Sequence, residues 1–229
     1  YRTAYLKCHY PTQFLASLLK SLLGSSQTVA RYIEDFSKYG IRLLPPDVNK
    51  SFAAFTAEGR HVRFGLSALK NVGYAFPDAM AAEWEANGPF TSFPEFIERM
   101  AGKELNKRVM EVLISCGVFD SLHPNRRALM LCYEKLIDRA MEQIRDRAAG
   151  QMSFFGGGPA SGIAPPVEAV PDGVEDFSAA DKLRLEREYA GMYLTGHPLD
   201  DWRVKMKAFS PSGIGALYEA PPPEGTSVR

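Results

Sequence analysis

The amino-acid sequence predicts a mainly α-helical fold, a helical bundle that carries one small β-hairpin and continues into a flexible linker and a short helix. Apolar residues recur at helical spacing in most segments between residues 11 and 149. Two short apolar runs flank a polar turn at residues 57–60. The periodicity then stops at residues 150–180. The 229 residues, 45% apolar and 24% charged, suit one medium globular domain or a domain with appendages.

The N-terminal segment predicts two helices with apolar stripes. The first covers residues 11–23, and the second runs to Tyr39, where Gly40 suits a position just past a helix end. The stripes consist of Phe14, Leu15, Leu18, Leu19 and Leu22 in the first helix and of Val29, Ile33 and Phe36 in the second.

The segment that follows changes from helical to extended character. Residues 43–47 contain adjacent prolines and are expected to form an extended connection. Residues 52–56 and 61–65 flank the polar turn at 57–60 and predict the β-hairpin.

Helical periodicity returns at residue 66. Asn125 is expected to cap the longest of these helices with its side chain. The predicted elements are one short turn or helix at 66–69 and helices at 74–86, 93–100, 107–116 and 125–149.

Residues 150–180 differ in kind from the rest of the chain. They are rich in Gly, Pro and Ala and contain no Lys or Arg. Such a segment buries too little apolar surface to order itself, so it is expected to be a flexible linker. A further short helix is expected at 182–193, and Pro198 lies in the segment that follows it.

Composition and spacing exclude several classes of function. The formal net charge is zero, so any nucleic-acid contact must come from a local patch. Cys8, Cys116 and Cys132 are odd in number and lack metal spacing, which fits a reducing cytoplasm. No apolar run is long enough to span a membrane. No catalytic constellation and no metal site are predicted, and the Asp200–Asp201 pair is expected to be a solvated turn.

The turn at residues 70–74 resembles a helix-hairpin-helix motif. Its core is Asn71-Val72-Gly73, where the motif usually has Gly-apolar-Gly. Asn tolerates positive φ well, so Asn71 can replace the first glycine. Exposed backbone N–H groups and the start of the next helix would then hold a DNA phosphate, with Val72 directed inward. The candidate DNA-binding residues are Arg63, Lys70, Asn71, Val72, Gly73 and Tyr74, with further charge from Arg60. An ordinary turn between packed helices is the alternative.

A second, more degenerate unit of the same kind follows at residues 96–108. Of its turn, only Gly102 fits the motif. The basic residues Lys103, Lys107 and Arg108 cluster at the start of a helix, where they oppose the helix dipole and therefore indicate a nearby anion. Solvated surface lysines are the alternative.

A short apolar peptide lies inside the linker. It consists of Gln151, Met152, Ser153, Phe154 and Phe155 and is followed at once by glycines. Two phenylalanines in a linker have no core of their own to enter, so burial in another protein is expected, with Gln151 at the edge of the pocket. The pattern resembles the peptides with which bacterial DNA polymerases bind the sliding clamp. Packing back onto its own domain is the alternative.

Several segments in order resemble the C-terminal half of the catalytic α subunits of bacterial DNA polymerase III, the C family of replicative polymerases. These segments are residues 1–7, 9–11, 44–49, 63–66, 70–73, 106–109, 117–122, 150–155 and 193–199. The resemblance implies the end of a fingers domain at 1–45 and a tandem helix-hairpin-helix module at 46–124. It also implies a long helix at 125–149, a linker at 150–180 with its clamp-binding peptide at 151–155, and a segment at 181–229 that leads to an OB-type domain.

The resemblance also carries expectations about activity and partners. The chain, which starts without Met, is expected to be a fragment of a DNA-directed DNA polymerase. The family's metal-binding aspartates belong to the palm, upstream of Tyr1, so this fragment is expected to be inactive alone and to hold no cofactor, although the full polymerase uses Mg²⁺. Expected partners are the sliding clamp, duplex DNA and other holoenzyme subunits, in the cytoplasm. An error-prone paralogue of the same subunit and an α-helical scaffold without DNA contact are the alternatives.

Overall fold

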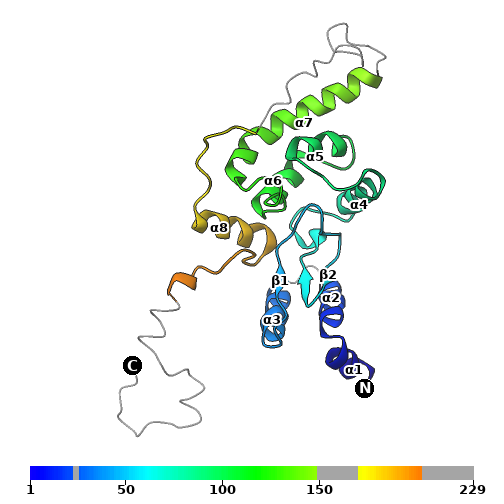
Figure 1. Ribbon diagram of the computed structural model, residues 1–229, viewed down its shortest axis with the longest axis vertical. Coiled ribbons are helices and arrows are strands. Elements are labelled where there is room, and N and C mark those ends of the chain that lie inside the picture. Colours follow the sequence, from blue (N-terminus) through cyan, green and yellow to red (C-terminus); the bar gives the residue numbers. More distant parts are fainter. Residues whose placement is uncertain (23–25, 149–169, 203–229) are drawn as a thin grey trace. The chain divides into compact units, whose positions relative to one another are not determined.

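The computed structural model describes residues 1–22, 26–148 and 170–202, in two compact units, Tyr1–Leu194 and Thr195–Arg229 (Figure 1). The predicted mainly α-helical class with a small β-hairpin is confirmed. The helices are α1 (Arg2–His9), α2 (Pro11–Ser21), α3 (Ser26–Ser37), α4 (Ala75–Asn87), α5 (Phe93–Met100), α6 (Lys107–Ser115), α7 (Arg126–Ala148) and α8 (Ala179–Ala190). The strands are β1 (Leu43–Leu44), β2 (Thr56–Glu58) and β3 (His61–Arg63), and the short 3₁₀ turns are η1 (Leu66–Ala68) and η2 (Asp200–Trp202).

Local capping explains where the helices begin and end. The side chain of Asn125 accepts a hydrogen bond from the backbone N–H of Ala128 at 2.9 Å, which confirms the predicted cap of α7. Gly40 follows α3 with φ +74° and donates its N–H to the carbonyl of Ser37. The sequence did not reveal α1, because none of its residues is buried and no apolar stripe marks it.

The hairpin is part of a sheet with the order β1-β3-β2. β2 and β3 pair antiparallel, as predicted, but over shorter runs than expected. The extended connection forms β1, which pairs parallel with β3. Gly65 follows β3, and a Cβ there would lie 2.5 Å from both the carbonyl carbon of Ala54 and the backbone nitrogen of Phe55. Only glycine allows these two backbone segments to approach so closely.

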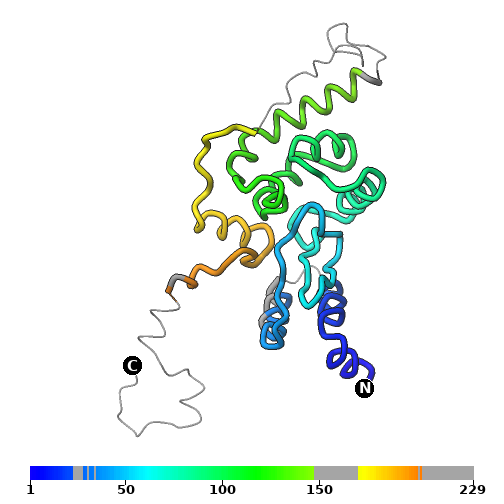
Figure 2. Tube along the Cα trace, viewed as in Figure 1, coloured from blue at the N-terminus to red at the C-terminus, as the bar shows by residue number. Residues whose placement is uncertain are grey.

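The hydrophobic core is one cluster that extends from α2 and α3 past the sheet to the C-terminal helices of the first unit. α7 packs against both α5 and α6, as the chain trace in Figure 2 shows. Aromatic rings meet edge-on between these elements, with centroids 4.8–5.0 Å apart. The buried rings are Phe90, Phe93, Phe96 and Phe119.

The C-terminal end of the predicted flexible linker, residues 170–180, differs from the expectation, because contacts with the folded unit hold it. Residues 170–178 have no regular structure, yet Asn125 donates to the carbonyl of Val174 at 2.6 Å, and the backbone N–H of Arg127 donates to Asp176 at 3.2 Å. Lys182 also pairs with Asp176. Composition misses this segment because specific polar contacts anchor it. Helix α8 accordingly begins at Ala179, with Ser178 as its cap, before the predicted residue 182.

Candidate nucleic-acid interface

The first hairpin turn connects η1 to α4 at residues 70–74. Asn71 has φ +63°, which confirms that it adopts the left-handed conformation normally taken by glycine. The side chain of Val72 is only 4% exposed and points inward, as predicted. By contrast, Lys70, Asn71, Gly73 and Tyr74 are exposed. The turn thus exposes Lys70, Asn71, Gly73 and Tyr74 to solvent, while the buried side chain of Val72 anchors it to the core.

The backbone N–H groups of this turn are not all available. Lys70 donates its N–H to the carbonyl of Tyr189 at 2.9 Å, and Val72 donates to Leu69 at 3.2 Å. Across the described part of the chain, no acceptor is recorded for the N–H groups of Gly73 and Tyr74. Helix α4 starts at the next residue, and the side chain of Tyr74 makes no capping hydrogen bond. These donors sit at the positive end of a helix dipole.

Arg63, predicted to contact DNA, occupies an internal position. Its guanidinium pairs with Glu58 at 2.7 Å and donates to the carbonyl of Pro45 at 2.8 Å. The residue is 8% exposed. It therefore braces the hairpin against the preceding connection and is unavailable to a phosphate. Glu58 is held ionised, since its hydrogen bond with Arg63 lowers its pKa.

The second hairpin turn lies between α5 and α6. It contains Gly102 at φ +77° and Glu104 at φ +58°. The side chain of Asn106 caps α6 by accepting from the N–H of Val109 at 2.9 Å. Lys107 pairs with Asp138 at 2.8 Å and lies 3.8 Å from Glu134. Hydrogen bonding to Asp138 raises the pKa of Lys107.

The other predicted basic residues of this unit differ from each other. Lys103 pairs with the buried carboxylate of Glu83. Arg108 is exposed, and no ion pair is recorded for it with any described residue. Of the three predicted cations of the second unit, Arg108 is thus the one whose charge is open to a ligand.

Glu83 is a buried acidic residue beside the second turn that the sequence analysis did not single out. Its carboxylate accepts from Arg99 at 3.0 Å and from Asn87 at 2.7 Å, and it also pairs with Lys103. These partners, with Lys103 first, lower its pKa to about 2 despite burial. A signal was present in the sequence: Glu83 follows Phe76 and Met80 at helical spacing, so it lies on the buried face of α4.

The two hairpin units, both within Tyr1–Leu194, border one open depression of about 540 Å³. Lys70 and Asn71 of the first turn line it together with Lys107 and Arg108 at the start of α6. Two segments 37 positions apart in the sequence are therefore side by side, as the tandem arrangement requires. Acidic and aromatic side chains complete the lining: Glu111, Tyr133, Glu134, Glu188 and Tyr189.

Helix α8 belongs to this site, which the sequence did not indicate. Its Tyr189 accepts the N–H of Lys70 and donates its hydroxyl to Glu111 at 3.2 Å. Desolvation of the ring raises the pKa of Tyr189. The helix itself is fixed by Glu186, which is 0% exposed and pairs with Arg126 at 3.0 Å. A helix from beyond the linker therefore holds the first turn in place.

Arg126 is the centre of a buried ion-pair network. It is 1% exposed, pairs with Asp120 at 2.7 Å and with Glu186, and donates to the carbonyl of Ser115 at 3.1 Å. It also fills the space beside Gly117, where an added Cβ would lie 2.2 Å from its Nη2. Loop 116–120, α7 and α8 are thereby joined at one side chain.

Two searches of the described residues and the position of the linker peptide complete the description of the site. No group of three or more potential metal ligands occurs among residues 1–22, 26–148 and 170–202, and no helix there is long and apolar enough to cross a membrane. The linker peptide Gln151, Met152, Ser153, Phe154 and Phe155 lies outside the described residues.

Known proteins resemble this chain along its length. A family model described as "Helix-hairpin-helix motif" matches residues 40–129, which include both turns. The chain is 35% identical over 230 residues to DNA polymerase III subunit alpha of Mycobacterium tuberculosis, covering 100% of this chain and 19% of that protein. The same subunit of Thermus aquaticus is 39% identical over 200 residues, which is 87% of this chain and 16% of the subunit.

A third relative extends the same comparison. DNA polymerase III subunit alpha of Borreliella burgdorferi is 35% identical over 212 residues, or 92% of this chain and 18% of that protein. The chain thus spans about a fifth of the length of these relatives. By homology over nearly its whole length, it belongs to the family of bacterial DNA polymerase III α subunits.

Proposed function

We propose that this chain is the segment of a replicative DNA polymerase that holds duplex DNA by its phosphates and tethers the enzyme to the sliding clamp. One observation carries the DNA part. The left-handed Asn71 turn and the exposed start of α6 line the same depression, although they come from separate hairpin units. Two such turns, each at a helix start, can hold two phosphates without reading base sequence.

The proposed phosphate contacts are a subset of the predicted residues. Lys70 and Arg108 supply charge that is open to solvent, and the N–H groups of Gly73 and Tyr74 supply backbone donors. Lys103 and Lys107 already pair with carboxylates, so they contribute less. Glu111, Glu134 and Glu188 at the same depression repel phosphate. The resulting affinity for DNA is weak.

A low affinity for DNA is sufficient for an enzyme that is tethered to the clamp. The peptide at 151–155 has the form of a clamp-binding motif, and the relatives are polymerase α subunits. A bound clamp raises the effective concentration of the hairpin module at the duplex, so affinity that is low in solution suffices. We therefore propose that the chain acts as part of a DNA-directed DNA polymerase.

Duplex DNA binding tests the first half of the proposal. Fluorescence anisotropy of a labelled duplex at several salt concentrations gives a log–log slope of about −0.9 per phosphate neutralised. The Lys70→Gln/Arg108→Gln variant should weaken binding and flatten the slope by about 1.8. The Lys135→Gln/Arg145→Gln variant removes the same charge from exposed positions on α7 and should bind as wild type. Equal loss in both variants contradicts a localised site.

Clamp binding tests the second half. The Gln151→Ala/Phe154→Ala/Phe155→Ala variant should lose most of its surface plasmon resonance response on immobilised sliding clamp, because a buried Phe155 anchor alone is worth about 2 kcal/mol, roughly 30-fold in Kd. Leu199→Ala, at an exposed apolar residue outside the peptide, is the matched control. Unchanged affinity of the triple variant refutes the tether.

A helical scaffold without DNA contact is the second candidate. The pairing of Lys103 and Lys107 with carboxylates favours it. Salt-independent interaction with duplex DNA, together with no effect of the Lys70→Gln/Arg108→Gln variant, would support the scaffold.

A further inference from the structure

A second basic surface lies at the end of the small sheet, away from the residues of the hairpin turns. Arg42 precedes β1 and His61 begins β3, and the backbone N–H of Arg42 donates to His61 Nδ1 at 3.3 Å. The N–H of Val62 in turn donates to the carbonyl of Arg42 at 3.0 Å. The parallel pairing of β1 and β3 therefore fixes Arg42 beside the hairpin turn that carries Arg60.

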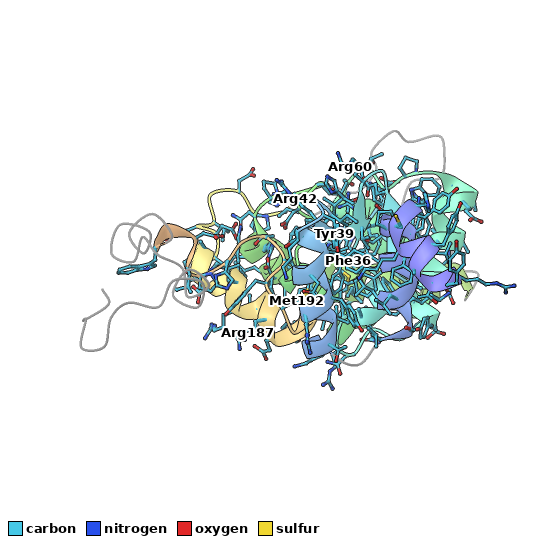
Figure 3. The ribbon with its side chains drawn as sticks, turned by 90° about the horizontal axis from the view of Figure 1, so that it is seen from below. Phe36, Tyr39, Arg42, Arg60, Arg187 and Met192 are labelled. Atoms are coloured by element: carbon cyan, nitrogen blue, oxygen red, sulfur yellow. The ribbon has the colours of Figure 1, made fainter. Side chains whose placement is uncertain are left out.

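The connection from α3 completes this surface. A Cβ built on Gly40 would lie 3.8 Å from Nη2 of Arg60, so the chain after α3 passes directly beneath that guanidinium. Gly40 has φ +74°, which turns the chain sharply here and places Tyr39 next to the same edge. Figure 3 labels Tyr39, which lies just past α3, Arg42, which lies just before β1, and Arg60, which lies in the β2–β3 turn.

The charge of this surface is not cancelled by its neighbours. Both guanidiniums are exposed, and no ion pair is recorded for either one within the described ranges. Two acidic residues whose side chains the structure describes on these elements, Asp35 and Glu58, are engaged elsewhere. Asp35 pairs with Lys38 at 3.1 Å, and Glu58 pairs with Arg63. The two arginines therefore project a local positive field from a chain whose net charge is zero.

The ring of Tyr39 adds a feature that a phosphate site does not need. Its side chain is 62% exposed, while its ring contacts Phe36 at a centroid distance of 6.0 Å. Phe36 is 2% exposed and belongs to the core, so it supports the tyrosine ring from one side. A supported aromatic ring near two exposed guanidiniums can stack an unpaired base while the arginines hold the adjacent phosphates.

We propose that Tyr39, Arg42 and Arg60 form a binding site for single-stranded DNA, separate from the duplex site at the hairpin turns. A single strand is the ligand class, because the bases of a duplex are already stacked and cannot reach the Tyr39 ring. The arginines bind without sequence preference. The site shares no residue with the duplex contacts Lys70, Gly73, Tyr74 and Arg108, and it takes Arg60, whose charge was expected from the sequence to serve the first turn.

Anisotropy titrations of the 229-residue chain with a labelled 12-nucleotide oligo-dT test the site. The Arg42→Gln/Arg60→Gln variant should weaken binding at least about fivefold and flatten the salt slope by about 1.4, since single strands give about −0.7 per charge. Tyr39→Ala should weaken it by about fivefold or more through lost stacking, and Tyr39→Phe should retain wild-type affinity. The Lys135→Gln/Arg145→Gln variant is the charge control.

Two further arms separate stacking from simple charge. An abasic strand of the same length has no base to stack, so Tyr39→Ala should leave its affinity unchanged, while the double arginine variant still weakens it. Duplex affinity should stay within about twofold of wild type in all these variants, because the hairpin residues are intact. Unchanged melting temperatures verify folding.

Three outcomes would overturn the proposal. These are wild-type oligo-dT affinity in the double arginine variant, equal loss for abasic and oligo-dT strands in Tyr39→Ala, and equal loss for duplex and single strand. A failure of the duplex site instead appears as duplex affinity that does not respond to Lys70→Gln/Arg108→Gln.

Discussion

The two hairpin units share a motif but use their charges differently. In the first unit Lys70 is exposed and forms no ion pair with any residue that the structure describes, and its turn has exposed backbone donors. In the second unit Lys103 and Lys107 pair with Glu83 and Asp138 across helices. The first turn is thus arranged to meet a ligand, whereas most of the second is arranged to hold α4, α5 and α7 together. A basic residue at a hairpin is not, by itself, a DNA contact.

The largest expected effect comes from breaking the network that supports both units. Arg126→Ala should lower the free energy of unfolding by about 3–5 kcal/mol, because it leaves the buried carboxylate of Glu186 without its partner. Urea denaturation measures this loss. Arg127→Ala, at the exposed neighbouring position, should change stability by less than about 0.5 kcal/mol. Similar values for the two variants would show that the network does not support the fold.

The next effect is a pH dependence that comes from Glu83, which joins α4 to α5 and to the second turn. The pKa of Glu83 is lowered from 4.5 to about 2, so its contribution is fully present above pH 4.5 and is lost as the pH falls toward 2. We expect a loss of about 2 kcal/mol between pH 6 and pH 2.5 relative to a Glu83→Gln variant, measured by denaturation at each pH. Parallel pH profiles for the two proteins would contradict this role of Glu83.

A smaller effect compares the cations of the two turns directly. Lys70→Gln should weaken duplex binding by about threefold to tenfold, because no residue in the described ranges forms an ion pair with Lys70. Lys103→Gln should change duplex affinity by less than about twofold and should instead lower stability by about 1 kcal/mol, since it strips a partner from Glu83. Reversed results, with Lys103 dominating DNA affinity, would invert the assignment of the two units.

The smallest effect concerns the left-handed residues of the turns. Glu104→Gly should stabilise the chain by up to about 1 kcal/mol, because glutamate at φ +58° is strained and glycine is not. Asn71→Gly should gain less, since asparagine tolerates φ +63° better. Thermal unfolding of both variants checks the order of the two gains.

Local signals in the sequence predicted much of this fold. Helix α5 has the predicted bounds, Asn125 caps α7, and Asn71 has positive φ, because periodicity, capping and turn chemistry act within a few residues. Long-range pairings were not predictable. The parallel β1–β3 contact, the Arg126–Glu186 pair 60 residues apart and the docking of α8 on the first turn depend on tertiary packing.

The same limit applied to the candidate site. The hairpin residues were located, but whether a lysine is free or paired depends on which helix lies opposite. Lys107 meets Asp138, 31 positions away, and no local pattern records that.

The docking of α8 has a mechanical consequence. Ala148, at the end of α7, and Val170, in the segment before α8, both belong to the unit Tyr1–Leu194. A force applied to the chain between these two residues therefore reaches the folded unit at two points, the end of α7 and the segment that leads into α8. Tyr189 of α8 accepts the N–H of Lys70, so such a force acts on the first turn through α8.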